Sequence, residues 1–146
     1  REGETAMKIN NTTALRLWDE RYGYRLWVED FDGGLMYRDA YNDREVSAVR
    51  TFGNQYALST QQIMRVSYGQ KIYCGWNLHH ILPKSNGGTN AKDNLICANI
   101  ITNDEAEDKT TFWIDDRNYQ VQWNKQTRLY EIFRLNPSRQ NSLFGW

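Results

Sequence analysis

The chain has 146 residues, with 18 basic and 18 acidic side chains and therefore no formal net charge at pH 7. This length suits a single domain with its own hydrophobic core, and zero net charge argues against a protein that coats nucleic acid through bulk charge. No apolar stretch reaches the roughly 18 residues of a membrane span, and no signal peptide is visible. We therefore expect a cytoplasmic protein without a membrane partner.

The cysteines and the chain ends add to this picture. Cys74 and Cys97 are the only two cysteines, which fits a reducing compartment and predicts no disulfide framework. Their spacing excludes a structural zinc site with four cysteine ligands. The sequence opens on Arg1, so its natural start is missing or trimmed, and Met7 is a candidate start. We predict one domain over residues 1–146, with flexible tails at 1–10 and 136–146.

The first predicted element is a helix over Asn11–Tyr22. An apolar stripe runs along it, at Leu15, Leu17 and Trp18. Thr12 or Thr13 can cap its start, because a hydroxyl oxygen can accept a hydrogen bond from a free backbone N–H. Gly23 predicts its end.

A β-hairpin and a second helix are predicted next. Tyr24–Phe31 and Leu35–Arg38 alternate in polarity and flank an Asp-Gly-Gly turn, which is typical of a hairpin. Ser59–Tyr68 predicts a helix that leads towards the central stretch. Tyr41–Asn54 fits neither pattern clearly.

The central stretch, residues 76–109, contains the only two histidines, His79 and His80, side by side. Residues 76–81 predict a short strand, and neighbouring residues of a strand point to opposite faces. Two adjacent histidines therefore chelate one ion poorly, but one of them can bind metal while the other accepts a proton. Pro83 predicts the end of this strand, because proline lacks a backbone N–H.

A loop, a second strand and a helix are predicted to follow. Residues 84–90 have the composition of a loop, with glycines at 87 and 88. Asp93–Ala98 predicts the second strand. Asn103–Lys109 predicts a helix, with Thr102 as its N-cap and acidic residues in its first turns.

These landmarks together resemble the HNH endonuclease family and its ββα-metal motif, also called the His-Me finger. The residues that carry the resemblance are the adjacent histidines with Pro83, the Gly87-Gly88 pair, Asn94 followed by Leu95, and Asn103 nine positions after Asn94. The resemblance covers about a quarter of the chain. It implies a ββα-metal motif over residues 76–109. Together with the helix and hairpin predicted before the motif and an antiparallel meander predicted after it, this gives an α+β single domain.

The resemblance also implies roles for individual residues. His80 falls at the general base, His79 and Asn103 fall at metal ligands, and Asn94 falls at the asparagine that braces the loop. Glu107 lies one helical turn after Asn103, where bacteriocin nucleases of this family place a third ligand. A solvated helix residue is the alternative role for Glu107.

One divalent ion is the implied cofactor, and it would stabilise the charge that develops on the phosphoryl and leaving oxygens. Mg²⁺ is the expected ion, while the imidazole ligand keeps Mn²⁺, Ni²⁺ and Zn²⁺ as alternatives. Neutral His80 would take a proton from the attacking water, because the unperturbed pKa of histidine is about 6.5.

Basic residues predict where DNA would bind. No acidic residue lies between Glu45 and Asp93, whereas the block from Asp104 to Asp116 is rich in them. A basic approach surface that leads to an acidic, metal-attracting end would suit a nuclease, and ordinary charge scatter is the alternative. The predicted phosphate contacts are Arg65, Lys71, Lys84 and Lys109.

Three β-rich segments after the motif predict a small antiparallel meander. They are Phe112–Ile114, Tyr119–Trp123 and Leu129–Leu135, separated by polar turns. Tyr119, Val121 and Trp123 share one face by alternation. We expect that face to be core, and base stacking on it is the alternative.

The sequence thus predicts a metal-dependent DNA endonuclease of the HNH type. Two other functions fit the same residues. A catalytically dead nucleic-acid-binding module would bind DNA without cutting it, and a toxin nuclease domain neutralised by an immunity protein would be toxic when expressed alone. Oligomeric state and target sequence stay open.

Overall fold

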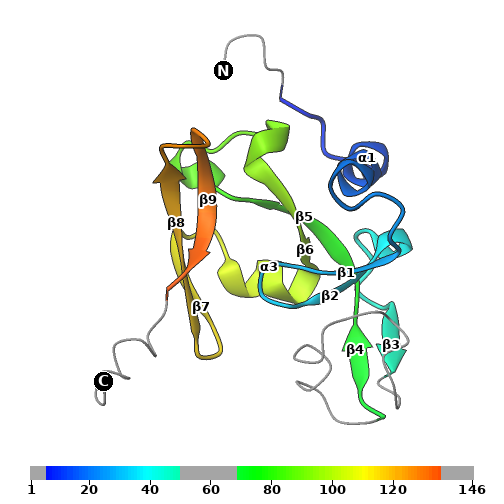
Figure 1. Cartoon of the computed structure of the whole chain (residues 1–146). Coiled ribbons are helices and arrows are strands. Elements are labelled where there is room, and N and C mark those ends of the chain that lie inside the picture. Colours follow the sequence, from blue (N-terminus) through cyan, green and yellow to red (C-terminus); the bar gives the residue numbers. More distant parts are fainter. Residues whose placement is uncertain (1–5, 50–68, 136–146) are drawn as a thin grey trace.

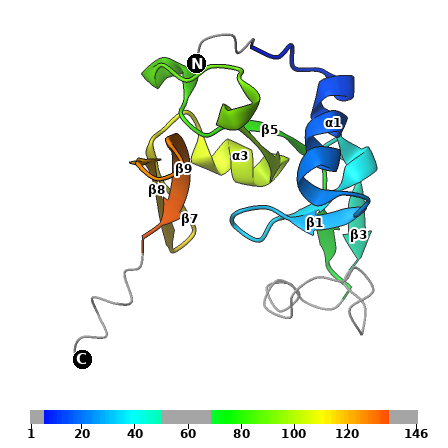
Figure 2. The same cartoon turned by 45° about the horizontal axis from the view of Figure 1, so that its top comes forward.

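The computed structural model describes residues 6–49 and 69–135. Within these ranges the chain forms one α+β domain with two α-helices and nine strands, paired antiparallel in four small sheets (Figure 1). The helix α1 and the C-terminal sheet lie on opposite sides of the central β5–β6 hairpin in both views (Figures 1 and 2). Neither described helix is long and apolar enough to cross a membrane.

Helix α1 (Asn11–Tyr22) has the predicted bounds, but its cap differs from the prediction. The N-cap is Asn10, not Thr12 or Thr13. Asn10 Oδ1 accepts the N–H of Thr13, and Thr13 Oγ1 accepts the N–H of Asn10, both at 3.0 Å. This reciprocal pair satisfies backbone donors that a helix start leaves free. Gly23 ends the helix as predicted, with φ at 65°.

Strands β1 (Trp27–Glu29) and β2 (Leu35–Tyr37) form the predicted hairpin, with shorter strands than expected. The buried carboxylate of Asp30 shapes its loop, because Oδ1 accepts the N–H groups of Asp32 at 2.9 Å and Gly34 at 2.6 Å. A Cβ at Gly34 would lie only 2.7 Å from Asp30 Oδ2, so a glycine is required there.

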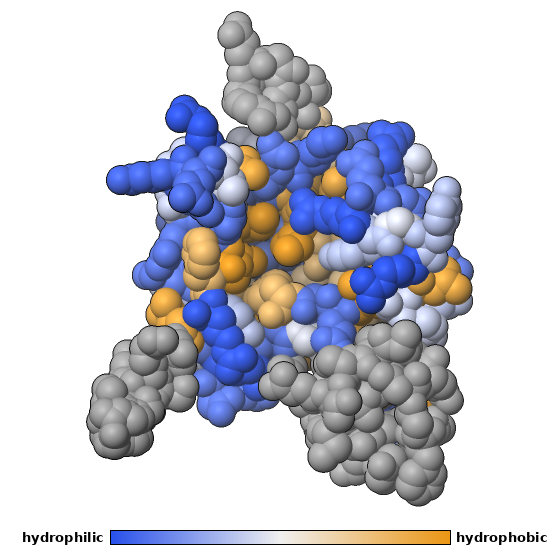
Figure 3. Space-filling view, viewed as in Figure 1, coloured by the Kyte–Doolittle hydropathy of each residue, from blue (hydrophilic) through white to orange (hydrophobic). Residues whose placement is uncertain are grey.

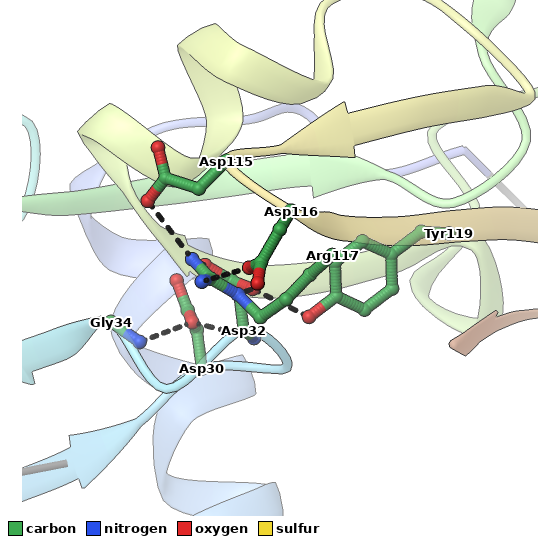
Figure 4. Close-up of polar contacts among 7 residues, drawn as sticks. All are labelled: Asp30, Asp32, Gly34, Asp115, Asp116, Arg117 and Tyr119. Carbon is green, nitrogen blue, oxygen red and sulfur yellow. Dashed lines mark hydrogen bonds and ion pairs between the residues drawn. The ribbon is translucent and has the colours of Figure 1, made fainter. Parts of the chain in front are cut away.

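A buried ion pair ties the tip of this hairpin to the C-terminal sheet (Figure 4). Arg117 donates from Nε and Nη2 to both carboxylate oxygens of Asp32, at 2.6 and 2.9 Å, and the Tyr119 hydroxyl donates to Asp32 at 2.5 Å. Asp115 and Asp116 add longer contacts to Arg117 from the exposed side. The hydrogen bonds that Arg117 donates to Asp32 raise the pKa of Arg117 above its ordinary value.

Strands β5 (Trp76–His80) and β6 (Leu95–Asn99) pair antiparallel, and helix α3 (Ile100–Ala106) follows β6 directly. The predicted order of strand, loop, strand and helix is therefore present. The second strand begins two residues later than predicted, because Lys92–Asn94 forms a short 3-10 turn.

The predicted bounds of helix α3 are wrong. Asn99, not Thr102, is the N-cap, and its Oδ1 accepts the N–H of Ile101 at 2.8 Å. The Asn99 amide also donates to the Leu35 carbonyl at 2.6 Å, and Asp30 Oδ2 accepts the Asn99 N–H at 2.9 Å. These partners come from the distant β1–β2 hairpin, so tertiary contacts place the start of the helix.

The predicted meander is confirmed as β7 (Thr111–Ile114), β8 (Arg117–Asn124) and β9 (Leu129–Arg134). The prediction that one face of β8 is core is confirmed at only one end of the strand. Tyr119 is 2% exposed, whereas Trp123 on the same face is 49% exposed. The face is buried against α3 and the β1–β2 loop at one end and open at the other.

The main core lies between α1 and the β5–β6 hairpin. The indole rings of Trp18 and Trp76 meet there, with centroids 4.9 Å apart. Met7 and Ile9 pack against this cluster, and the Met7 N–H donates to the Asn90 carbonyl at 2.9 Å. The predicted tail at 1–10 is therefore anchored from Met7 onwards.

The segment that the sequence left unassigned contains strand β3 (Ser47–Val49), which pairs with β4 (Lys71–Tyr73). The predicted helix Ser59–Tyr68, the predicted DNA contact Arg65 and the predicted tail 136–146 lie outside the described residues.

Both cysteines are free and buried, and burial raises the pKa of Cys74 to about 11 and of Cys97 to about 12. Because the thiolate is the reactive form, both thiols should resist modification in the folded protein. We expect Ellman's reagent at about pH 8 to label neither thiol within minutes in buffer and both in denaturing guanidinium chloride. Rapid labelling of the folded protein would contradict the buried placement.

Candidate active site

His79 and Asn103 meet across the interface between β5 and α3. His79 Nδ1 lies 2.5 Å from Asn103 Oδ1, and Asn103 Nδ2 donates to Asn77 Oδ1 at 2.7 Å. Asn77 and His79 are two residues apart on β5 and so share the face that α3 covers. The two predicted metal ligands are thus neighbours, and Asn77, which is not among the predicted site residues, orients one of them.

His79 is 3% exposed and sits among aromatic rings. Its ring centroid lies 6.0 Å from that of Phe31 and 6.4 Å from that of Phe112. Burial lowers the pKa of His79, while the hydrogen bond to Asn103 opposes this shift. The ring is therefore neutral at pH 7. With Nδ1–H donated to Asn103, the buried Nε2 carries the lone pair and has no hydrogen-bond partner among the described residues.

His80 points to the opposite face of β5 and is half-buried. Its Nε2 lies 2.7 Å from Asn90 Oδ1, so Nε2–H donates to this oxygen and Nδ1 carries the lone pair. Asn90 was not among the predicted site residues. Loop composition alone does not indicate which of several amide side chains reaches the histidine.

Asn94 braces the loop of residues 81–94, as its position in the motif predicts. Its Oδ1 accepts the N–H of Leu82 at 2.8 Å, and its Nδ2 donates to the carbonyls of Leu82 and Thr89, both at 3.0 Å. Gly88 lies so close to Leu82 that a Cβ would collide with its carbonyl oxygen. The loop that follows His80 therefore has one fixed path.

Glu107 does not share the helical face on which its predicted role depends. Helix α3 ends at Ala106, and Glu107 follows as the C-cap with φ at 54°. Its exposed carboxylate pairs with Lys109 Nζ at 3.5 Å. In the described part of the chain, no three His, Cys, Asp or Glu side chains gather as a metal-binding group.

The predicted DNA contacts are dispersed. Lys84 is exposed in the 81–94 loop, Lys71 is exposed on β4, and Lys109 is engaged by Glu107. Figures 1 and 2 both place β4 and the 81–94 loop at opposite ends of the molecule. The run of basic residues in the sequence thus does not place Lys71 and Lys84 on one surface.

The histidine pair, Asn94 and Asn103 are held within one strand, loop, strand and helix unit, in which His79 contacts Asn103. No protein-family model, curated protein or solved structure matches this chain.

Proposed function

We propose that this chain is a metal-dependent DNA endonuclease of the HNH type. The observation that carries the proposal is the contact between His79 on β5 and Asn103 on α3, next to His80. The loop that Asn94 fixes supports it, because a defined loop path holds Asn90 against His80. These are the residue types that metal-assisted phosphodiester hydrolysis uses.

To hold a divalent ion, His79 and Asn103 would give up their hydrogen bond: with the imidazole proton on the unpartnered Nε2 in place of Nδ1, Nδ1 and Asn103 Oδ1 would both offer lone pairs to the ion. Burial keeps the His79 ring neutral at pH 7. Imidazole nitrogen and amide oxygen suit Mn²⁺, Ni²⁺ and Zn²⁺, while Mg²⁺ prefers oxygen and retains water ligands. When bound, the ion stabilises negative charge on the phosphate. Two protein ligands leave positions for water and substrate.

His80 acts as the base. The hydrogen bond from Nε2 to Asn90 fixes its ring and leaves the Nδ1 lone pair to accept a proton. The attacking water gives this proton to His80 as its oxygen bonds to phosphorus, and the bond to the leaving oxygen breaks. The leaving oxygen then takes a proton from solvent.

Supercoiled plasmid tests the proposal directly. We expect nicked or linear product with added Mn²⁺, Ni²⁺, Zn²⁺ or Mg²⁺, and none with EDTA. Plasmid that is bound but never cut under any of these ions would refute the nuclease and leave a binding module.

Metal affinity should depend on His79 and Asn103. Alanine at either position is expected to weaken Mn²⁺ binding, measured by calorimetry, by roughly 10-fold or more, because each change removes a donor atom. Glu107→Ala is the matched control and should leave the affinity unchanged, since Glu107 pairs with Lys109. Unaltered affinity in both ligand variants would place the ion elsewhere.

A further inference from the structure

We propose that a groove beside the candidate active site binds an unpaired base of DNA, so that the preferred substrate is single-stranded or locally unwound DNA. This inference rests on the proposed nuclease function. The groove lies between the 81–94 loop and the turn end of β8 and β9, with a volume of about 260 Å³. Leu82, Gly88 and Asn94 line its loop side, and Trp123, Arg128 and Tyr130 line its sheet side.

An exposed aromatic pair forms the sheet side of the groove. Trp123 and Tyr130 lie opposite each other on β8 and β9, with ring centroids 5.1 Å apart and planes at 68°. Trp123 is 49% exposed and Tyr130 is 39% exposed. Every base has a flat aromatic face, so an exposed indole can stack on an unpaired base whatever its sequence.

A second hollow of about 310 Å³ adjoins the groove along β9, and Asp93, Leu129 and Tyr130 line both. Figure 3 shows apolar side chains gathered in a hollow on this face. Most of its lining is apolar, from Phe31, Ile81, Ile96, Leu129 and Ile132, and the charged residues Arg21, Asp93 and Glu131 lie at it as well. A base that leaves its stack loses apolar contacts, and such a surface can replace them.

Cations flank the groove where the backbone of a bound strand would run. Arg128 lines it, Lys125 lies in the same turn, and Lys84 lies in the loop opposite. None of the three forms an ion pair within the described ranges 6–49 and 69–135. Asp93 is the one carboxylate in the lining, and Glu131 nearby is engaged by side chains of its own turn.

The groove and the candidate base share one loop. Asn94 lines the groove and donates to the carbonyl of Thr89. Asn90, which follows Thr89 in the chain, accepts the hydrogen bond from His80. A base seated against Trp123 would therefore fix the path of its strand relative to His80. A paired base cannot offer its face in this way, which is why we infer an unpaired substrate.

Equilibrium binding of a short fluorescein-labelled oligothymidylate to the full chain tests this inference. Anisotropy is measured in EDTA, so that cleavage does not interfere. We expect tighter binding of the single strand than of its duplex with oligoadenylate. Trp123→Ala should raise Kd by about 5-fold or more, and Trp123→Phe should restore part of the loss. Trp113→Ala is the control, because Trp113 is 54% exposed on β7 of the same sheet but lies outside the groove.

The inference is overturned if Trp123→Ala and Trp113→Ala bind the oligonucleotide equally, or if the duplex binds more tightly. A Trp123-dependent dimer without oligonucleotide binding would also overturn it and assign the groove to a second copy of the chain. Trp123→Phe keeps the test decisive should the alanine variant unfold. Plasmid cleavage separates the two proposals: cutting with Trp123-independent binding refutes only the groove, and Trp123-dependent binding without cutting refutes only the nuclease.

Discussion

Replacing His80 with alanine is expected to slow metal-dependent plasmid cleavage by about 100- to 10,000-fold, the usual contribution of a general base. His80 has no second histidine to replace it, because His79 is buried on the other face of β5 and donates Nδ1–H to Asn103. The measurement is the initial rate of conversion of supercoiled to nicked plasmid at saturating Mn²⁺.

Two controls distinguish loss of a base from loss of structure. The Mn²⁺ affinity, measured by calorimetry, should stay close to that of the unaltered protein, because His80 contacts Asn90 and not the His79–Asn103 pair. Plasmid binding, measured separately in EDTA, should also be unchanged. Added imidazole should restore part of the rate of His80→Gly by supplying the missing proton acceptor. If the His80→Ala protein cuts plasmid at the original rate, His80 is not the base.

Replacing Asp32 with alanine is expected to lower the free energy of unfolding by about 3–5 kcal/mol, the typical cost of removing one partner of a buried ion pair. Asp32 accepts two hydrogen bonds from Arg117 and one from Tyr119, and the Arg117 side chain is only 13% exposed. The variant leaves Arg117 with the longer contacts to Asp115 and Asp116 alone. Thermal unfolding should shift down by roughly 10 °C.

Asp39→Ala is the matched control. Asp39 also pairs with an arginine, Arg38 at 3.4 Å, but its side chain is 59% exposed. Exposed pairs contribute about 0–1 kcal/mol, so this variant should unfold close to the original temperature. A double-mutant cycle with Arg117→Met isolates the pair energy. Equal stabilities of the Asp32 and Asp39 variants would show that the buried ion pair does not anchor the hairpin.

The Asp32 ion pair also bears on the candidate site. Phe31, next to Asp32, lies with its ring 6.0 Å from His79 and 5.3 Å from Tyr119. The hairpin tip therefore helps to cover His79 and to lower its pKa by burial. Stability and the environment of the candidate metal ligand thus depend on the same contact between distant parts of the chain.

The sequence by itself determined the elements whose signals are local. The bounds of α1 follow from its apolar stripe and Gly23, and the β1–β2 turn follows from its glycines. The meander follows from alternating segments between polar turns. The order of strand, loop, strand and helix around the histidines was predictable for the same reason, as was the bracing role of Asn94. Each of these depends mainly on residues close together in the sequence.

Only the tertiary structure decided which side chains meet. Asn99 caps α3 because Asp30 and the Leu35 carbonyl, both from the distant hairpin, hold it in place. The helix ends at Ala106, Glu107 follows with a positive φ, and the carboxylate of this predicted third ligand pairs with Lys109. Trp123 is exposed because the body of the domain covers only the Tyr119 end of β8. Local periodicity specifies the face of a strand or helix, but what covers that face depends on packing between segments far apart in the chain.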